Sequence, residues 1–138
     1  MLNRYHLFKT LNLVVFCSFY IGAGINHFWH PRGYLDLIPP YLPWHPLLNI
    51  LSGIFEISGG ILMIIPSTRR LSAIGLILLL ILLVPAHIYM IQMGGCVSQR
   101  MCVSMWVAIV RLPLQVILIW WAWKTYKTNA GQISRVLI

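Results

Sequence analysis

The chain has 138 residues, of which 59% are hydrophobic and only 9% are charged. A soluble domain carries roughly 25% charged residues, so this composition excludes an ordinary water-soluble domain, and the length suits one domain. The net charge is +8, but the basic residues lie in short polar segments between apolar stretches, which is typical of membrane topology signals and not of a nucleic-acid-binding patch.

Four apolar stretches are long enough to cross a bilayer, because a transmembrane helix needs about 20 residues at a rise of about 1.5 Å each. The first stretch lacks the small-residue cleavage site of a signal peptide and is expected to be retained. We therefore predict an all-α fold, a four-transmembrane-helix bundle that forms one integral membrane domain over residues 1–138. The predicted spans are residues 10–28, 46–66, 71–93 and 103–123.

Lys and Arg in the short flanking segments predict the orientation, because cytoplasmic loops are enriched in them. Seven basic residues flank the spans on the side of the termini: Arg4, Lys9, Arg69, Arg70, Lys124, Lys127 and Arg135. The other side carries Arg32 and Arg100. We therefore expect both termini to face the cytoplasm, in the inner (plasma) membrane of a bacterium, with the lipid bilayer as partner and a homo-oligomer as a further possibility.

The segment between the first two spans is rich in proline. It reads WHPRGYLDLIPPYLPWHP over residues 29–46, and its five prolines prevent one long helix. We expect a short interfacial helix near residues 33–38, followed by an extended stretch on the outer leaflet. Such a segment either caps a cavity between the helices or is a plain interfacial tether.

Two ionisable side chains lie near the middle of predicted spans, where an isolated charge costs roughly 2.5–3.5 kcal/mol or more. Glu56 lies about ten residues, or roughly 15 Å, from the outer end of its span. Arg111 lies about eight residues, or roughly 12 Å, from the outer end of the fourth span. Because these depths match, we expect the two side chains to pair, directly or through water. The pair is either part of a functional cavity or a structural ion pair that fixes the helix register.

Other polar side chains lie near the same depth. His27 ends the first span, and His87 lies about six residues from the outer end of the third. Pro85 and Pro113 are expected to bend the helices beside His87 and Arg111. The predicted catalytic residues are Glu56, Arg111 and His87. The predicted ligand-binding residues are His27, Asn26, Ser52 and Gln115.

No metal site is predicted. His27 and His30 have H-x-x-H spacing, but Pro31 follows at once, and a His/His/Glu set would lie beside the cationic Arg111.

Cys96 and Cys102 lie in one outer loop, where the compartment permits a disulfide. Their five intervening residues are not the spacing of a redox motif. A structural disulfide is therefore favoured over a catalytic one, and two free thiols are the alternative.

Several short motifs together resemble those of the DoxX-like family of small four-helix membrane proteins, over about residues 10–124. The motifs are H-F-x-x-P at residues 27–31, S-G-x-x-E-x-x-G-G at 52–60, P-x-T-R at 66–69, P-A-H at 85–87 and R-L-P-L-Q at 111–115. Members often carry Asn where this chain has His87. The resemblance implies a four-helix bundle and suggests quinone-linked redox chemistry, and more distant relatives assist receptor assembly.

Three functions compete at this stage. In the first, the protein is a quinone-associated redox component, with a quinone held between the helices. The chain carries no haem, flavin or iron–sulfur motif, so no intrinsic cofactor is expected and a partner redox protein would supply the electrons. In the second, it is a non-catalytic assembly or chaperone protein whose polar layer is structural. A small transporter is the third, and it would need a dimer because four spans show no internal repeat.

Overall fold

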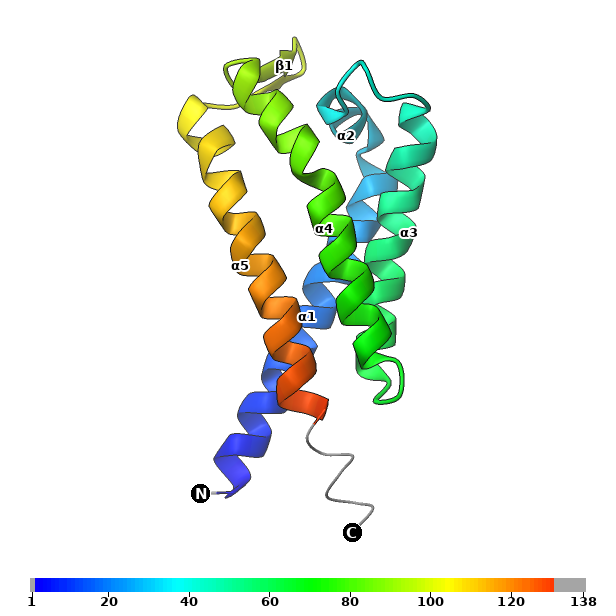
Figure 1. Ribbon diagram of the computed structural model, residues 1–138, viewed down its shortest axis with the longest axis vertical. Coiled ribbons are helices and arrows are strands. Elements are labelled where there is room, and N and C mark those ends of the chain that lie inside the picture. Colours follow the sequence, from blue (N-terminus) through cyan, green and yellow to red (C-terminus); the bar gives the residue numbers. More distant parts are fainter. Residues whose placement is uncertain (1, 131–138) are drawn as a thin grey trace.

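The computed structural model describes residues 2–130, and it confirms the predicted all-α membrane fold (Figure 1). Within this range five helices and one short hairpin follow each other along the chain. They are α1 (Leu2–Trp29), α2 (Pro31–Leu37), α3 (His45–Ile64), α4 (Arg69–Gln92), β1 (Cys96–Ser98), β2 (Met101–Cys102) and α5 (Met105–Ala130). The helices α1, α3, α4 and α5 are each long and apolar enough to cross a membrane, so the chain is a multi-pass membrane protein.

The helix bounds differ from the predicted spans mainly at the two ends of the chain. Helix α1 begins at Leu2 and α5 continues to Ala130, so each has about two more turns than its predicted span. No proline or glycine interrupts these extra turns, and the helix therefore continues beyond the apolar stretch. The expected short helix in the proline-rich segment is α2, which begins at Pro31, where the missing N–H costs no hydrogen bond.

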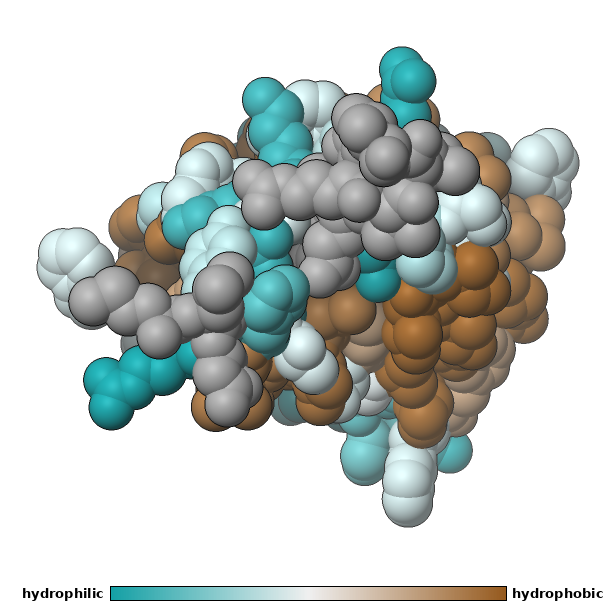
Figure 2. Space-filling model, turned by 90° about the horizontal axis from the view of Figure 1, so that it is seen from below, coloured by the Kyte–Doolittle hydropathy of each residue, from teal (hydrophilic) through white to brown (hydrophobic). Residues whose placement is uncertain are grey.

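The four long helices run between two ends of the bundle (Figure 1). The start of α1, the end of α5 and the turn between α3 and α4 lie at one end, which we call the terminal end. Helix α2 and the β1–β2 hairpin lie at the other, the hairpin end. Seen from the terminal end, hydrophilic residues gather around the helix ends and hydrophobic residues cover the visible flank (Figure 2). This distribution suits a bundle whose flanks face lipid.

The order of the helices around the bundle is α1, α3, α4, α5. The neighbours are therefore α1 with α3, α3 with α4, and α4 with α5, while α3 and α5 lie on a diagonal. Helix α5 also meets α1, but the bonds between them lie near the terminal end. There Asn12 accepts a hydrogen bond from the Trp121 indole at 2.9 Å and donates to Thr125 at 3.1 Å, and Phe16 packs edge-on against Trp121.

The closest helix contact joins α1 to α3 through glycine. A Cβ atom added at Gly24 would lie 2.7 Å from the main-chain oxygen of Gly53 and 2.9 Å from the main-chain nitrogen of Ile57. A Cβ at Gly53 would in turn lie 2.9 Å from the Cβ of His27. Small residues allow such close approach in lipid, where van der Waals packing is a main force between helices. This contact sets the depth and rotation of α3 against α1.

Side-chain hydrogen bonds close the turn between α3 and α4. The Thr68 hydroxyl donates to the Leu62 carbonyl at 2.7 Å, and the Arg69 Nε donates to the Met63 carbonyl at 2.9 Å. These carbonyls belong to the last turn of α3, which has no helical N–H to bind them. The Ser72 hydroxyl ties α4 to α3 by donating to the Gly59 carbonyl at 2.6 Å.

Replacing Gly24 by Ala is expected to destabilise the bundle by about 1–3 kcal/mol, because the new methyl group meets main-chain atoms of α3 that cannot move aside. Thermal unfolding in detergent, followed by tryptophan fluorescence, measures the change. Gly22→Ala is the matched control, since no atom lies within 4 Å of its added Cβ. Equal melting temperatures for both variants would contradict the close contact.

Candidate functional site

A buried polar cluster lies between α1 and α3. His27 is 5% exposed, and its Nδ1 atom lies 2.8 Å from the Oδ1 atom of Asn49, which is also 5% exposed. The Nε2 atom of His27 lies 3.6 Å from the Oε2 atom of Glu56. Glu56 is 7% exposed, and Oε2 has no hydrogen-bond partner among the described residues. The Tyr20 hydroxyl is also buried without a partner in that range, and it lies within electrostatic reach of Glu56.

The position of Asn49 follows from Pro31, which comes just after the end of α1. In a helix the carbonyl of His27 would accept a hydrogen bond from residue 31, but Pro31 has no N–H. The Nδ2 atom of Asn49 donates to this carbonyl at 3.1 Å instead. Asn49 therefore binds both the main chain and the ring of His27, and so holds the imidazole in one orientation.

The expected pair between Glu56 and Arg111 is not formed as a direct ion pair in the structure. Among the described residues, Glu56 meets His27 within 4.0 Å, and no ion pair joins it to Arg111. The reason is the helix order, since Glu56 lies on α3 and Arg111 on α5, which lie on a diagonal of the bundle. The two residues match in depth but face different neighbours.

Arg111 lines a pocket at the hairpin end, where α1 and α5 diverge (Figure 1). The pocket has a volume of about 320 Å³. Its lining residues come from α1, α2, the hairpin and α5: Asn26, His30, Gly33, Tyr34, Leu37, Met101 and Arg111. Arg111 is half-buried, and across residues 2–130 its guanidinium has no hydrogen bond and no ion pair, although its charge acts on nearby His87. The pocket therefore holds an uncompensated cation within a membrane span.

Tyr34 connects the pocket with the buried cluster. Its ring stacks on the His27 ring with centroids 3.8 Å apart, and Tyr34 also lines the pocket. Its hydroxyl accepts a hydrogen bond from Asn26 Nδ2 at 2.7 Å, and Asn26 Oδ1 lies 2.8 Å from the Nδ1 atom of His30. His27 is therefore separated from the pocket by the thickness of one aromatic ring.

The remaining predicted site residues lie outside this arrangement. Gln115 donates to the main-chain carbonyl of Leu80, about one turn before Pro85 in α4, so it ties α5 to α4 beside the proline within that helix. Gln115 also lies beside His87, whose Nδ1 atom is buried without a partner in the described part of the chain. Ser52 is half-buried and makes no hydrogen bond within residues 2–130.

Sequence reasoning missed the two residues that hold His27. The sequence does contain an indication of the role of Asn49, because this residue lies seven residues before Glu56 and therefore on the same face of α3. The carbonyl left free by Pro31 is a second signal. Tyr34 carries no comparable signal, since its contact with His27 depends on how α2 folds back over the bundle.

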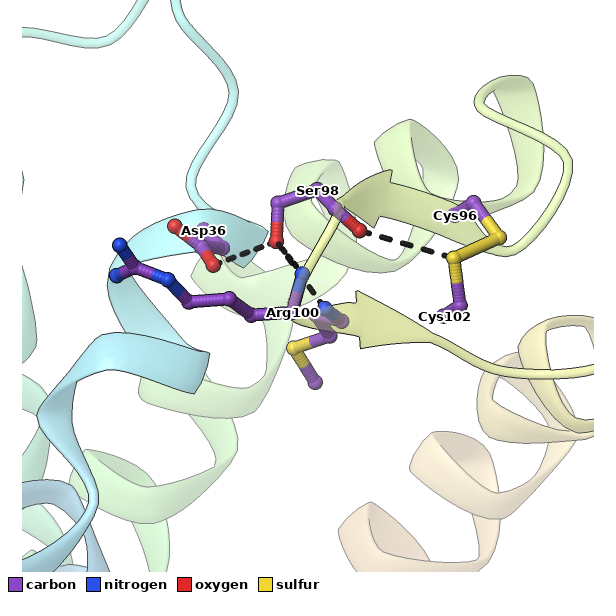
Figure 3. Close-up of a disulfide and its surroundings, with 6 residues drawn as sticks. Asp36, Cys96, Ser98, Arg100 and Cys102 are labelled. Atoms are coloured by element: carbon purple, nitrogen blue, oxygen red, sulfur yellow. Dashed lines mark hydrogen bonds between the residues drawn. A yellow bond between two sulfur atoms is a disulfide. The ribbon is translucent and has the colours of Figure 1, made fainter.

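The hairpin forms part of the pocket wall and is anchored to α2 (Figure 3). The Ser98 hydroxyl donates to the Asp36 carboxylate at 2.6 Å, and it accepts the main-chain N–H of Met101 at 3.1 Å. Cys96 and Cys102 are joined by a disulfide and are both exposed. The bond therefore closes a loop that carries Met101 into the pocket.

A family model described as "Domain of unknown function (DUF8561)" matches residues 16–126. The chain belongs to this family. The match includes every residue of the buried cluster and of the pocket. No curated protein and no solved structure matches the chain.

The two histidines of the H-x-x-H pair bind different partners, His27 with Asn49 and His30 with Asn26. Among the residues that the structure describes, no group of three or more His, Cys, Asp or Glu side chains is arranged to hold a metal ion.

Asn49→Ala is expected to lower the free energy of unfolding by about 1–3 kcal/mol, because it leaves the His27 carbonyl and ring nitrogen without partners. Thermal unfolding in detergent measures the loss. Ser52→Ala, on the same helix, is the control and should change the melting temperature little. A loss of the same size in both variants would argue against a special role for Asn49.

Replacing both Cys96 and Cys102 by Ser is expected to destabilise the closed hairpin by about 2 kcal/mol, the typical loop-closure contribution of a disulfide over so short a loop. Limited proteolysis of the hairpin in detergent should then become faster. Cys17→Ser, at the free buried cysteine of α1, is the control and should leave this cleavage rate unchanged. An unchanged rate in the double variant would show that Ser98 and Asp36 suffice to hold the hairpin.

Proposed function

We propose that this protein is a quinone-associated component of membrane redox chemistry, and that the quinone ring binds in the pocket at the hairpin end. The observation that carries the proposal is Arg111, a half-buried guanidinium that lines the pocket and has no hydrogen-bond acceptor among the described residues. An arginine inside a membrane span is costly unless something compensates its charge, and this favours a ligand with oxygen acceptors.

A quinone fits the chemistry of the pocket walls. Its ring is apolar and planar, and its two carbonyl oxygens accept hydrogen bonds. Arg111 offers donors to one oxygen, while Asn26 and His30 are polar groups for the other. The walls formed by Tyr34, Leu37 and Met101 are aromatic or apolar and suit the ring itself. A few polar groups in a mostly apolar pocket are typical of small-molecule sites.

The shape of the bundle supports entry from the bilayer. The bonds between α1 and α5 are made by Asn12, Trp121 and Thr125, near the terminal end, and the two helices separate toward the hairpin end (Figure 1). A volume of about 320 Å³ is near the lower limit for ligand pockets, which begin at roughly 300 Å³. It suits a ring, so an isoprenoid tail would lie in the lipid beside α1 and α5.

The chain's own residues would bind and orient the quinone, and a partner redox protein would supply the electrons, since the sequence has no motif for an electron-carrying cofactor. The resemblance to DoxX-like proteins supports this assignment. The same proposal puts the protein in the inner membrane of a bacterium with both termini in the cytoplasm, because seven of the nine basic residues that flank the spans belong, in the sequence, to the two terminal segments and to the segment between the second and third spans.

Arg111→Gln is expected to weaken binding of a short-chain ubiquinone analogue about 10- to 100-fold, the loss of a hydrogen bond to a charged group. Quenching of tryptophan fluorescence in nanodiscs measures the affinity. Arg100→Gln removes an exposed cation of the hairpin turn and is the matched control, with little expected change.

A photoreactive quinone provides an independent readout, because it should label peptides that contain Tyr34 or Met101. Equal affinities for both arginine variants, together with labelling elsewhere in the bundle, would contradict the quinone site. The polar residues would then be structural, as expected for a non-catalytic assembly protein.

A further inference from the structure

The contact between His27 and Glu56 brings two potential hydrogen-bond acceptors together, and the groups around His27 fix which ring nitrogen carries its proton. The amide of Asn49 has one orientation, because its Nδ2 atom donates to the His27 carbonyl, which can only accept. Its Oδ1 atom therefore faces the His27 Nδ1 atom at 2.8 Å and must accept a hydrogen bond from it. The proton of a neutral imidazole is thus fixed on Nδ1, and Nε2 is left as a bare acceptor.

The bare Nε2 atom faces another acceptor. Glu56 Oε2 lies 3.6 Å away and has no hydrogen-bond partner among the described residues. An ionised carboxylate only accepts hydrogen bonds, so a neutral histidine and an ionised glutamate would point two lone pairs at each other. The two side chains are only 6% and 10% exposed, so bulk water does not relieve this opposition. One added proton removes it, whichever of the two atoms carries it.

We propose that His27 and Glu56 form a buried proton-binding site, which holds one exchangeable proton between the His27 Nε2 atom and the Glu56 carboxyl group. The proton makes the pair either a neutral acid with a neutral imidazole or a carboxylate with an imidazolium. In both forms the site carries no net charge, which lowers the cost of placing it within the membrane.

The other titratable groups around the pair leave this proton count unchanged. Tyr20 of α1 lies within electrostatic reach of Glu56, and Tyr34 of α2 stacks on His27. On α4, Arg69 binds the carbonyls at the far end of α3. His87 of α4 and Arg111 of α5 interact with each other.

The site lies directly behind the pocket wall, because Tyr34 lines the pocket and stacks on His27. A quinone that takes up two electrons from a partner redox protein also takes up two protons to become a quinol. In this proposal the His27–Glu56 pair is the store for one of these protons, and the solvent at the hairpin end supplies the other and then returns a proton to the pair. This use of the proton rests on the proposed function, whereas the site itself does not.

The test counts protons on the full-length protein in nanodiscs without quinone, at about pH 8, where free glutamate is ionised and free histidine is neutral. Infrared spectroscopy detects a protonated carboxyl group, and ¹⁵N NMR of labelled histidine distinguishes imidazole from imidazolium. We expect one, and only one, of the two signatures. The chain contains two acidic side chains, so if the carboxyl band is the signature seen, Glu56→Gln must remove it and the matched control Asp36→Asn must leave it. If the imidazolium signal is seen instead, Glu56→Gln must remove that signal and Asp36→Asn must leave it.

A pH series provides a second readout. If the folded pair holds one proton more than the unfolded chain, stability falls as the pH rises, and the folding equilibrium constant decreases by up to about tenfold per pH unit. In Glu56→Gln the amide donates to Nε2 without an exchangeable proton, so this alkaline loss should disappear. Asp36→Asn should retain it.

An ionised Glu56 beside a neutral His27 at this pH, or two protons on the pair, would overturn the proposal. The spectra of the wild-type protein decide this even if a variant fails to fold. A proton count of one without any quinone binding would leave the site in place and would contradict the proposed function alone.

Discussion

The close approach of α1 and α3 is the constraint on which the rest of this structure depends. Gly24 and Gly53 bring two main chains into direct contact, and the same contact turns His27 toward α3. An imidazole and a carboxylic acid then meet in a place that solvent barely reaches. A larger residue at either glycine would separate the helices. The distances within the polar cluster would then change although all of its residues were still present.

Helix α1 packs closely against α3 on one side, and on its other side it contacts α5 over a shorter length. Helix α5 is bound to α1 through Asn12 and Trp121 near the terminal end, while residues of α1, α2, the hairpin and α5 line a pocket at the other end. The result is a bundle with a dense polar interior beside α3 and a shallow pocket beside α5. Tyr34 belongs to both, because one face of its ring lies on His27 and the residue also lines the pocket.

Much of the fold could be predicted from the sequence because lipid imposes simple requirements. A span must be apolar and about 20 residues long, so four long apolar stretches were sufficient to identify α1, α3, α4 and α5. The prolines of residues 29–46 likewise allowed only a short helix there, which is α2. The exact helix ends were less predictable, since α1 and α5 continue through polar residues that no hydropathy pattern marks as helical.

The candidate site was harder to predict, because counting residues gives depth in the membrane but not direction around the bundle. Glu56 and Arg111 have matching depths, yet the helix order places them on a diagonal. Asn49 was detectable in principle, from its seven-residue spacing to Glu56 and from the carbonyl that Pro31 leaves free. The contact of Tyr34 with His27 could be identified only from the structure, because a short helix such as α2 can lie over the bundle in several directions.

The disulfide of the hairpin depends on the redox state of the compartment that the hairpin end faces. Disulfides form and persist in oxidising compartments and are rare in the cytosol. Cys96 and Cys102, which are joined by such a bond, are both exposed at the hairpin end. Their bond would therefore persist where the hairpin end faces an oxidising medium and not where it faces a reducing one, a condition that is independent of the basic residues. In a reducing medium the hairpin would carry two thiols instead, and one wall of the pocket would lose its covalent closure.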